Sequence, residues 1–515
     1  MITPKKTVNA LKRVKAMADK HDAMIVMASE MSRQDRELLM KTGWLRDIVQ
    51  GWYLLTRPDI HPGDSASWYA NFWDFLRVYL QERFGTDYCL SAEASLELHI
   101  GNSVTPKQVV VIVKEGGTVQ QLPFDTSLLI YPDLKNLPKQ KEIIQGLQVM
   151  SLPLALCKVS PTYYRKLSDN IEIALRSIRD PADLTRIIVE NEFQSAAERI
   201  IGSYLFFGLE KEAGNIKRQL DLVGMQIYPK NPFEKTSPNL IATRFRSPSP
   251  YAARIELLWN KFRNPIIKLF PKEIGLPKNP KEYLRQVGEL YVYDAYNSLS
   301  IEGYQVSEEL IMRVQKKSWN PSLHPEDAKE RNALAARGYY EAFQAVKQTL
   351  KKILKGNSPG ECVEDDLSAW YQNLFSPSVQ AEIISRETLF GFRRDRVFIR
   401  NSRHSPPPFE AVLDSMETFF NCLRKEESAA VRAILGHYIF VFIHPYMDGN
   451  GRIARFILNT MLASGGYPWS IVQVKRRNEY INALEAVHTT SDIKPFVCFI
   501  IEEMQLSKKL LKSLL

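Results

Sequence analysis

The chain has 515 residues, 45% of them hydrophobic and 24% charged, and its 68 Lys and Arg against 58 Asp and Glu give a formal net charge of +10. This length is enough for about two to four domains, and the composition is that of a globular protein. No apolar run reaches the length of a membrane span, and the five cysteines form no Cys-x-x-Cys pair. We therefore expect a cytoplasmic protein without a membrane span, disulfide framework or zinc ribbon. The positive charge is compatible with nucleic acid, with other anionic partners, or with solubility alone.

Residues 1–60 predict a small helical module that ends in a hairpin. Apolar residues spaced by three predict a helix over 6–21, a capped pattern predicts another over 29–43, and residues 44–55 read as the hairpin. This order of elements, two helices followed by a hairpin, resembles a winged helix-turn-helix. The segment Gly51-Trp52-Tyr53 resembles the wing of AbiEi-type antitoxins. The resemblance implies weak DNA binding, and a module that contacts only protein is the alternative. The basic residues concerned are Lys5, Lys6, Lys12, Arg13, Lys15 and Arg46.

Residues 61–228 are expected to form a small α/β and helical region. Aromatic residues at helical spacing between 67 and 84 predict a core helix, residues 90–99 predict a second helix, and the β-branched run 108–113 predicts a buried strand. A helix followed by a strand again resembles the AbiEi family. We expect His99 to be a packed or capping histidine, because no second ligand stands at metal spacing nearby.

Proline and serine are concentrated between residues 229 and 250, so we place a linker there. Helical periodicity resumes at residue 251. We expect one helical domain over 251–515.

The stretch 444–455 predicts an anion-binding loop that opens a helix. The apolar, proline-free run before it predicts a buried helix that delivers His444 at its end, where Pro445 stops it. Gly449 and Gly451 can take positive φ, which lets successive backbone N–H groups turn inward. A helix that starts near Arg452 adds its positive dipole end. A tight turn before a solvated basic helix is the alternative, but it explains none of this order.

The charged side chains of this stretch suit phosphate chemistry. Asp448 is a hard oxygen ligand suited to Mg²⁺. Arg452 and Arg455 share a helix face and can grip phosphate oxygens, while His444 can accept a proton near neutral pH. We expect His437, seven residues earlier, to be a buried, hydrogen-bonded histidine, with a zinc pair as the alternative.

These twelve residues resemble the signature of Fic-domain enzymes, His-Pro-Phe-x-Asp-Gly-Asn-Gly-Arg-x-x-Arg, with Tyr446 in place of Phe. The family transfers AMP from ATP to a protein hydroxyl. The resemblance implies that His444 is the general base, Asp448 the ligand of Mg²⁺ or Mn²⁺, and Arg455 a γ-phosphate contact. The implied nucleotide-binding residues of the signature, of which the first four cradle the α- and β-phosphates, are Gly449, Asn450, Gly451, Arg452, Ile453, Ala454 and Arg455.

Residues 291–303 predict a helix that Gly303 ends, with Ser298 and Glu302 four apart on one face. This pattern resembles the inhibitory motif of Fic proteins, Ser/Thr-x-x-x-Glu-Gly/Asn. The resemblance implies that Glu302 pairs with Arg455 and takes the place of the γ-phosphate, so that bound ATP does not react. A helix end with a solvated glutamate is the alternative.

Two further segments resemble parts of the Fic fold. Residues 390–400 alternate apolar and basic residues, which predicts a hairpin. They resemble the Fic flap, which implies that a target protein lies along 393–400 as an added strand while Val397 covers the nucleotide. Residues 478–488 resemble the segment that wraps the adenine, which implies contacts from Tyr480 as a stacking ring, Ile481 and His488, the last where relatives often carry Asn.

The sequence therefore predicts a mainly α protein, with an all-helical Fic core and a small β-hairpin flap behind a winged helix-turn-helix and a small α/β antitoxin-like domain. The predicted function is an autoinhibited protein adenylyltransferase that uses ATP and Mg²⁺ and modifies a target protein or itself. A DNA-binding regulator or antitoxin-like adaptor whose Fic half senses nucleotide is the main alternative. Removal of AMP, or transfer of another nucleotidyl or phosphoryl group, is a third. The target, the release signal, the oligomeric state and any operator stay open.

Overall fold

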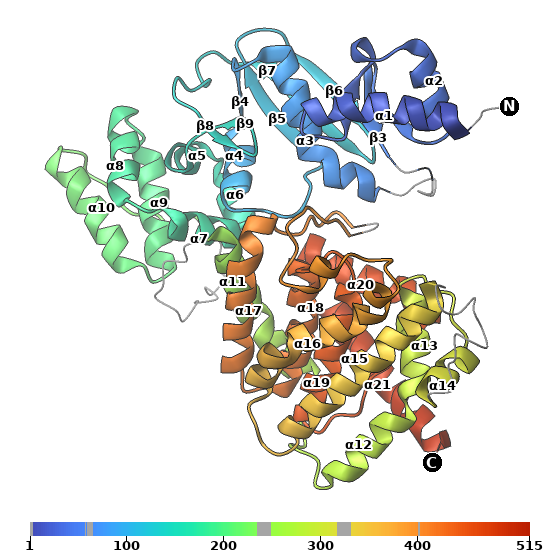
Figure 1. Cartoon of the computed structure of the whole chain (residues 1–515). Helices are drawn as coiled ribbons and strands as arrows, with labels where there is room; N and C mark the ends of the chain where they lie inside the picture. Colours follow the sequence, from blue (N-terminus) through green and yellow to red (C-terminus); the bar gives the residue numbers. More distant parts are fainter. Residues whose placement is uncertain are drawn as a thin grey trace. The chain divides into compact units, whose positions relative to one another are not determined.

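The computed structural model describes residues 4–56, 58, 65–233, 249–316, 331–399 and 402–514. It divides into two compact units, one made of Met1–Ala253 with Phe398–Ser405 and the other of Arg254–Val397 with Pro406–Leu515 (Figure 1). Most of the expected linker, residues 234–248, lies outside the described residues, as does Arg400 of the expected flap. Helices dominate both units, as the mainly α prediction requires.

The N-terminal unit begins with a three-stranded sheet and two helices. Its strands pair antiparallel in the order β1-β3-β2, which confirms the predicted hairpin. The Ser32 hydroxyl caps α2 by accepting from the Asp35 amide, and Val14, Val26 and Leu39 form the core. The elements are α1 (Pro4–Lys20), β1 (Ile25–Met27), η1 (Ala28–Glu30), α2 (Arg33–Lys41), β2 (Leu45–Val49) and β3 (Trp52–Leu55).

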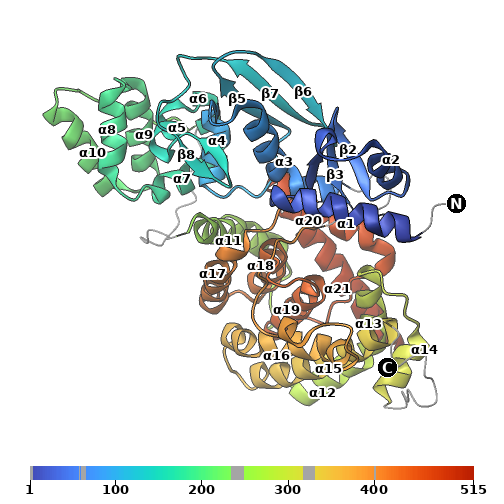
Figure 2. The same cartoon turned by 45° about the horizontal axis from the view of Figure 1, so that its top comes forward.

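A second sheet follows, with strand order β4-β5-β7-β6 and a parallel β5–β7 pair (Figure 2). The aromatic helix α3 packs on it through Trp68, Phe72 and Phe75, so the helix and the strand predicted at 108–113 are confirmed. His99 bonds the Met150 carbonyl at 2.7 Å, as a packed histidine does. The elements are α3 (Ala66–Phe84), β4 (Tyr88–Leu90), α4 (Ala92–His99), β5 (Gln108–Val113), β6 (Thr118–Leu122), β7 (Thr126–Pro132), β8 (Glu142–Ile144) and β9 (Leu147–Val149).

Six helices complete the first 230 residues of this unit: α5 (Leu152–Lys158), α6 (Pro161–Lys166), α7 (Ser168–Ser177), α8 (Pro181–Glu190), α9 (Gln194–Phe206) and α10 (Glu210–Leu222). A later stretch of chain also belongs to the unit, because Val104 and His404 form an antiparallel bridge. The Ser405 amide donates to the Ser103 carbonyl at 2.7 Å beside it.

The second unit is helical and is built around a central pair, α18 and α19. Every residue of α18 is buried, so the helix is apolar on all sides rather than amphipathic. Close packing of the neighbouring α15 and α16 requires Gly338, since a Cβ there would lie 2.0 Å from the Leu374 carbonyl oxygen. The elements are α11 (Pro250–Leu269), α12 (Pro280–Glu289), α13 (Tyr291–Ile301), α14 (Glu308–Gln315), α15 (Arg331–Ile353), α16 (Pro359–Gln380), η3 (Arg386–Leu389), η4 (Phe409–Ala411), α17 (Val412–Lys425), α18 (Ala429–Ile443), α19 (Asn450–Ser464), η5 (Val474–Arg476), α20 (Arg477–Thr490) and α21 (Lys494–Leu514).

The predicted hairpin at 390–400 is wrong for residues 390–399, which contain no strand. The backbone N–H of Arg393 donates to the Pro445 carbonyl at 2.9 Å instead of to a partner strand. The buried residue of this segment is the basic Arg393, whereas Phe390 and Phe398 are exposed, so the alternation does not mark a buried apolar face.

Among the described helices, we find none with the length and apolar character that a bilayer crossing requires.

Candidate active site

His444 stands at the end of α18 in a left-handed backbone conformation, with φ 52° and ψ 60°. This conformation costs a non-glycine residue about 1 kcal/mol and is held only where surrounding contacts impose it. The His444 amide still donates to the Phe440 carbonyl at 2.9 Å, and its Nδ1 lies 3.3 Å from the Val441 carbonyl oxygen. Burial, with the nearby positive charge of Arg393, lowers the pKa of His444 to about 4. The imidazole is therefore neutral at pH 7 and free to accept a proton.

The loop after His444 is braced by Asn450. Its Oδ1 accepts from the Tyr446 amide at 3.0 Å and its Nδ2 donates to the Tyr446 carbonyl at 2.7 Å. The ring of Tyr446 stacks on Tyr371 with centroids 3.8 Å apart and planes 6° apart. The side chain of Asn450 thus braces the loop, and the expected contact of this residue with nucleotide stays a prediction.

Glycine is required at positions 449 and 451 for different structural reasons. Gly449 has φ +84°, as expected, and a Cβ there would lie 2.8 Å from the Phe375 ring. Gly451, however, lies within α19, which begins at Asn450 rather than near Arg452. A Cβ on Gly451 would lie 2.4 Å from the Glu302 Oε1, so this residue is small because a carboxylate lies over the start of α19.

The first turn of α19 leaves backbone N–H groups without partners inside the helix, which makes it the candidate anion site. The Ile453 amide already donates to the Gly449 carbonyl at 3.0 Å, and the side chains of Ile453 and Ala454 are fully buried in the core. The expected nucleotide contacts of these two residues stay predictions. The amides that precede Ile453 are those which a helix leaves without internal partners.

Arg452 brings a buried positive charge to this turn. Its Nη2 lies 3.2 Å from the Asp448 Oδ1, and its guanidinium lies over the rings of Tyr304 and Phe375 at 5.2 and 5.1 Å. Within the described chain its buried Nε and Nη2 form no hydrogen bond, the Asp448 contact being an ion pair only. Buried donors of this kind normally have acceptors, so Arg452 is suited to an added anion.

Arg455 makes the contact that the sequence predicted with the helix 291–303, observed as α13. Its Nη2 donates to the Glu302 Oε1 at 2.7 Å, and its Nε donates to the Ser298 Oγ at 2.9 Å. Although burial opposes it, the negative charge of Glu302 raises the pKa of Arg455 above its ordinary value. Gly303, with φ +88°, ends the helix as expected. Glu302 is therefore paired with Arg455, although the residue is also exposed to solvent.

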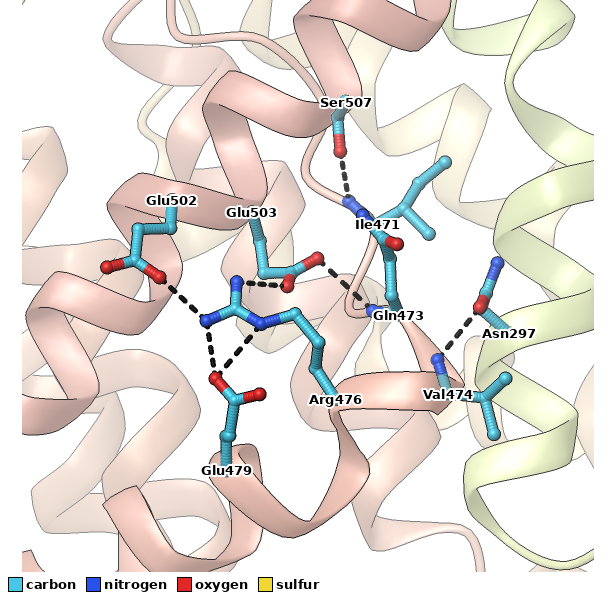
Figure 3. A network of polar contacts seen from close by, with 9 residues as sticks. All are labelled: Asn297, Ile471, Gln473, Val474, Arg476, Glu479, Glu502, Glu503 and Ser507. Atoms are coloured by element: carbon cyan, nitrogen blue, oxygen red, sulfur yellow. Dashed lines mark hydrogen bonds and ion pairs between the residues drawn. The ribbon is translucent and has the colours of Figure 1, made fainter.

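The helix α13 is also held on the side that Figure 3 shows. In Figure 3 the Asn297 Oδ1 accepts from the Val474 amide, at 2.8 Å. Outside that view, the Arg477 Nε donates to the Ile301 carbonyl at 2.9 Å. The segment η5 is fixed in turn by Arg476, whose Nη1 lies 2.8 Å from the Glu503 Oε1 (Figure 3). These contacts set the position of Glu302 over α19.

Sequence reasoning missed Asp294, which lies one and two turns before Ser298 and Glu302 on the same face of α13. Tyr339 donates to its Oδ2 at 2.7 Å, and burial raises the pKa of Asp294 to about 6. The spacing of four between 294, 298 and 302 was the signal for this third polar residue.

The residues expected around the adenine are arranged differently from the prediction. Tyr480 is buried, and its hydroxyl lies 2.7 Å from the Nε2 of His437. Its ring is therefore not a free stacking surface, whereas His437 is the buried histidine that was expected. Ile481 and Val397 are half-buried, and the Nδ1 of His488 lies 3.2 Å from the Tyr438 hydroxyl. The reason for the difference is that α20 turns Tyr480 toward the core.

A helix N-terminus with two buried arginines, beside a neutral histidine and an acidic side chain, defines a helical domain built to handle phosphate groups. Residues 362–462 match the Fic/DOC family, so the chain carries a domain of this family.

Curated relatives match 113 residues of the chain. Protein adenylyltransferase Fic of Drosophila yakuba is 39% identical over 113 residues, which are 21% of this chain and 22% of that protein. The Drosophila virilis protein of the same name is 38% identical over 113 residues, 21% of this chain and 23% of its own length. The chain thus spans less than a quarter of these relatives. Among solved structures, Fic-1 from C. elegans has 18% identity and a TM-score of 0.36, over 67% of this chain and 92% of that one.

Proposed function

We propose that the protein is an adenylyltransferase that moves AMP from ATP to a hydroxyl of a target protein, with itself as a further acceptor. The observation that carries the proposal is the anion site at the start of α19, which lies directly after a neutral His444 and contains the buried donors of Arg452. The names of the curated relatives support the same activity.

In this reaction His444 accepts the proton of the target hydroxyl as its oxygen attacks the α-phosphorus of ATP. The new bond joins the hydroxyl oxygen to phosphorus, the bond to the bridging oxygen breaks, and diphosphate leaves with the electron pair. The backbone amides of 450–452 and the guanidinium of Arg452 stabilise the charge on the phosphate oxygens. Neutral imidazole is the state that this step needs, and burial provides it.

Asp448 fits a magnesium ion held mainly by phosphate. Its side chain is 56% exposed, and the described residues contain no group of three or more side chains arranged as metal ligands. Mg²⁺ commonly takes one or two protein carboxylates together with phosphate oxygens and water, and Mn²⁺ accepts the same donors. When bound, the ion would neutralise charge on the phosphates, and Asp448 would hold it.

We further propose that Glu302 is a brake. Its carboxylate lies on Arg455 and over the Gly451 position, where the outermost phosphate of a productive ATP would lie. Two anions cannot share one guanidinium in a buried site at low cost, so ATP would bind with its terminal phosphate displaced and its α-phosphorus out of line.

The test is label transfer with the purified full chain and a cell extract. We expect Glu302→Gly protein to label targets from ATP carrying ³²P on the α-phosphate and not from ATP carrying it on the γ-phosphate. Transfer of the γ-label would show a phosphoryl transferase instead. Loss of AMP from previously labelled targets, without any net labelling, would favour AMP removal.

DNA binding by the N-terminal unit is a second candidate, supported by the sheet order β1-β3-β2 beside α1 and α2, elements that a winged helix also contains. Exposed lysines line α1, namely Lys5, Lys6, Lys12 and Lys15. Arg13 is paired with Asp35 at 2.6 Å and Lys15 with Asp19 at 3.0 Å, which leaves Lys5, Lys6 and Lys12 as the better phosphate contacts.

A further inference from the structure

The guanidinium of Arg393 is buried, at 5% exposure, and its partners are backbone carbonyls. Its Nε donates to the His444 carbonyl at 2.8 Å, its Nη1 to the Asp395 carbonyl at 3.0 Å, and its Nη2 to the Ile443 carbonyl at 3.4 Å and also to the Pro407 carbonyl. One side chain therefore joins the irregular segment 390–399, the segment before η4 and the end of α18.

Two of these carbonyls belong to the end of α18. The last carbonyls of a helix have no internal partner and carry the negative end of the helix dipole, so a cation there is stabilising. At this end the chain cannot continue as a helix, because His444 is left-handed and Pro445 has no N–H to donate. The Arg393 guanidinium supplies donors where the helix and the proline supply none.

The opposite end of α18 holds an arginine of the same chemistry, which allows a matched comparison. Arg432 is also buried, and its Nη1 donates to the carbonyls of Glu426 and Glu427 at 2.6 and 2.8 Å while its Nη2 donates to the Ser464 Oγ at 2.8 Å. Both arginines satisfy carbonyls at a helix end, but only Arg393 bonds the residue that carries the base.

We propose that Arg393 is a positioning residue for the proposed reaction: it holds the backbone of His444 in its left-handed conformation and ties the base to the segment expected to receive the target. The inference rests on the proposed function, since it concerns the base of that reaction. Lysine cannot replace this arginine, because a single ammonium cannot reach four carbonyls spread over the fork of a guanidinium. A shift of the base by about 1 Å is enough to cost a factor of 100 in rate.

The experiment compares Arg393→Lys with Arg432→Lys, both in the Glu302→Gly chain. We expect Arg393→Lys to lower kcat for AMP transfer by about 10- to 100-fold while the KM for ATP stays within about threefold. Arg432→Lys should lose a similar amount of Tm and keep its kcat per folded molecule. Equal losses of kcat in the two variants, in proportion to their losses of Tm, would overturn the proposal.

A second measurement separates this inference from the proposed function. If the Glu302→Gly chain transfers no AMP, the proposed function fails, and Arg393 is then judged by histidine NMR on the same chain, with His444→Ala used to assign the resonance. Arg393→Met should raise the pKa of the His444 imidazole, because a neighbouring positive charge is lost, whereas Arg432→Met should leave it unchanged. An unchanged His444 titration in Arg393→Met would overturn the inference by itself.

Discussion

Each compact unit contains a buried arginine paired with a glutamate, and the two pairs differ in what the carboxylate faces. In α7 Arg176 and Glu172 lie 2.8 Å apart, with side chains 8% and 4% exposed, as neighbours on one helix turn. In the other unit Arg455 and Glu302 lie 2.7 Å apart across two helices, with side chains 5% and 28% exposed. Both side chains of the first pair are almost fully buried, and we call this a closed pair. The second leaves its carboxylate partly accessible at the start of α19, next to the Gly451 position.

The comparison suggests a rule for buried ion pairs. Such a pair acts as a regulatory switch when a ligand of the same charge takes the place of one of its two side chains. Removing one member of a closed pair leaves a buried charge without compensation and lowers stability. Under the proposed function, removing Glu302 instead frees Arg455 for the outermost phosphate of ATP. The predictions below separate these two outcomes.

The largest effect is expected from His444→Ala in the Glu302→Gly chain. Freeing Arg455 raises the rate of AMP transfer only if the general base is present. AMP transfer should fall by about 10²–10⁴, because a general base is lost, while ATP binding stays nearly intact since the imidazole holds no phosphate. Single-turnover labelling and ATP titration measure the two quantities. An alanine variant that labels at the parent rate would show that another group takes the proton.

Glu302→Gly alone should raise self-labelling and target labelling by about 10- to 100-fold, the equivalent of one charged hydrogen bond at the terminal phosphate. The dependence on Mg²⁺ should not change. The double variant Glu302→Gly with Arg455→Ala should lose most of the gain, because the two residues act as a pair. Equal labelling by the wild type and Glu302→Gly would mean that α13 is ordinary scaffold.

Glu172→Gln breaks the closed pair and should lower the free energy of unfolding by about 3 kcal/mol, because Arg176 stays buried without its counter-charge. Labelling per folded molecule should not change. Urea unfolding and the labelling assay check the two statements. A variant that activates labelling as Glu302→Gly does would remove the distinction between the pairs.

Asp294, which lies on the same face of α13 as Glu302, should make the free energy of unfolding depend on pH. Its pKa is about 6 in the folded protein against 3.8 as the ordinary value, so the folded state binds the proton more tightly. This contribution to stability is present below about pH 4 and is lost as the pH rises to about 6, and it amounts to about 3 kcal/mol. Asp294→Asn should abolish this part of the pH dependence of unfolding. An unchanged profile would place the ionisation elsewhere.

The smallest effect concerns DNA. Replacing Lys5, Lys6 and Lys12 by Gln in the full chain should make the slope of log K against log salt shallower by about 2 to 3 for a short duplex, because fewer counterions are released. Replacing the exposed Lys508, Lys509 and Lys512 of α21 removes the same charge and should change little. Equal effects of the two triples would indicate nonspecific attraction by net charge.

The local sequence was enough to predict the features that depend on residues within one or two helical turns along the chain. The end of α18 at His444, the left-handed Gly449 and Gly303, and the shared face of Ser298 and Glu302 all follow from spacing and from the properties of proline and glycine. The pairing of Glu302 with Arg455 was predicted from resemblance and is observed at 2.7 Å. The winged-helix and antitoxin resemblances of the N-terminal unit stay predictions.

Only the tertiary structure decided which groups are free to act. Burial turned Tyr480 toward His437 and left no stacking surface, although its helix was predicted. The expected hairpin is absent at 390–399, and Arg393 of this segment bonds the carbonyls at the end of α18 instead. Leaving those buried carbonyls without donors would cost more free energy than leaving the exposed backbone of 390–399 outside a sheet. Such choices depend on atoms about fifty residues away along the chain, where periodicity carries no information, and desolvation rather than local preference determines their outcome.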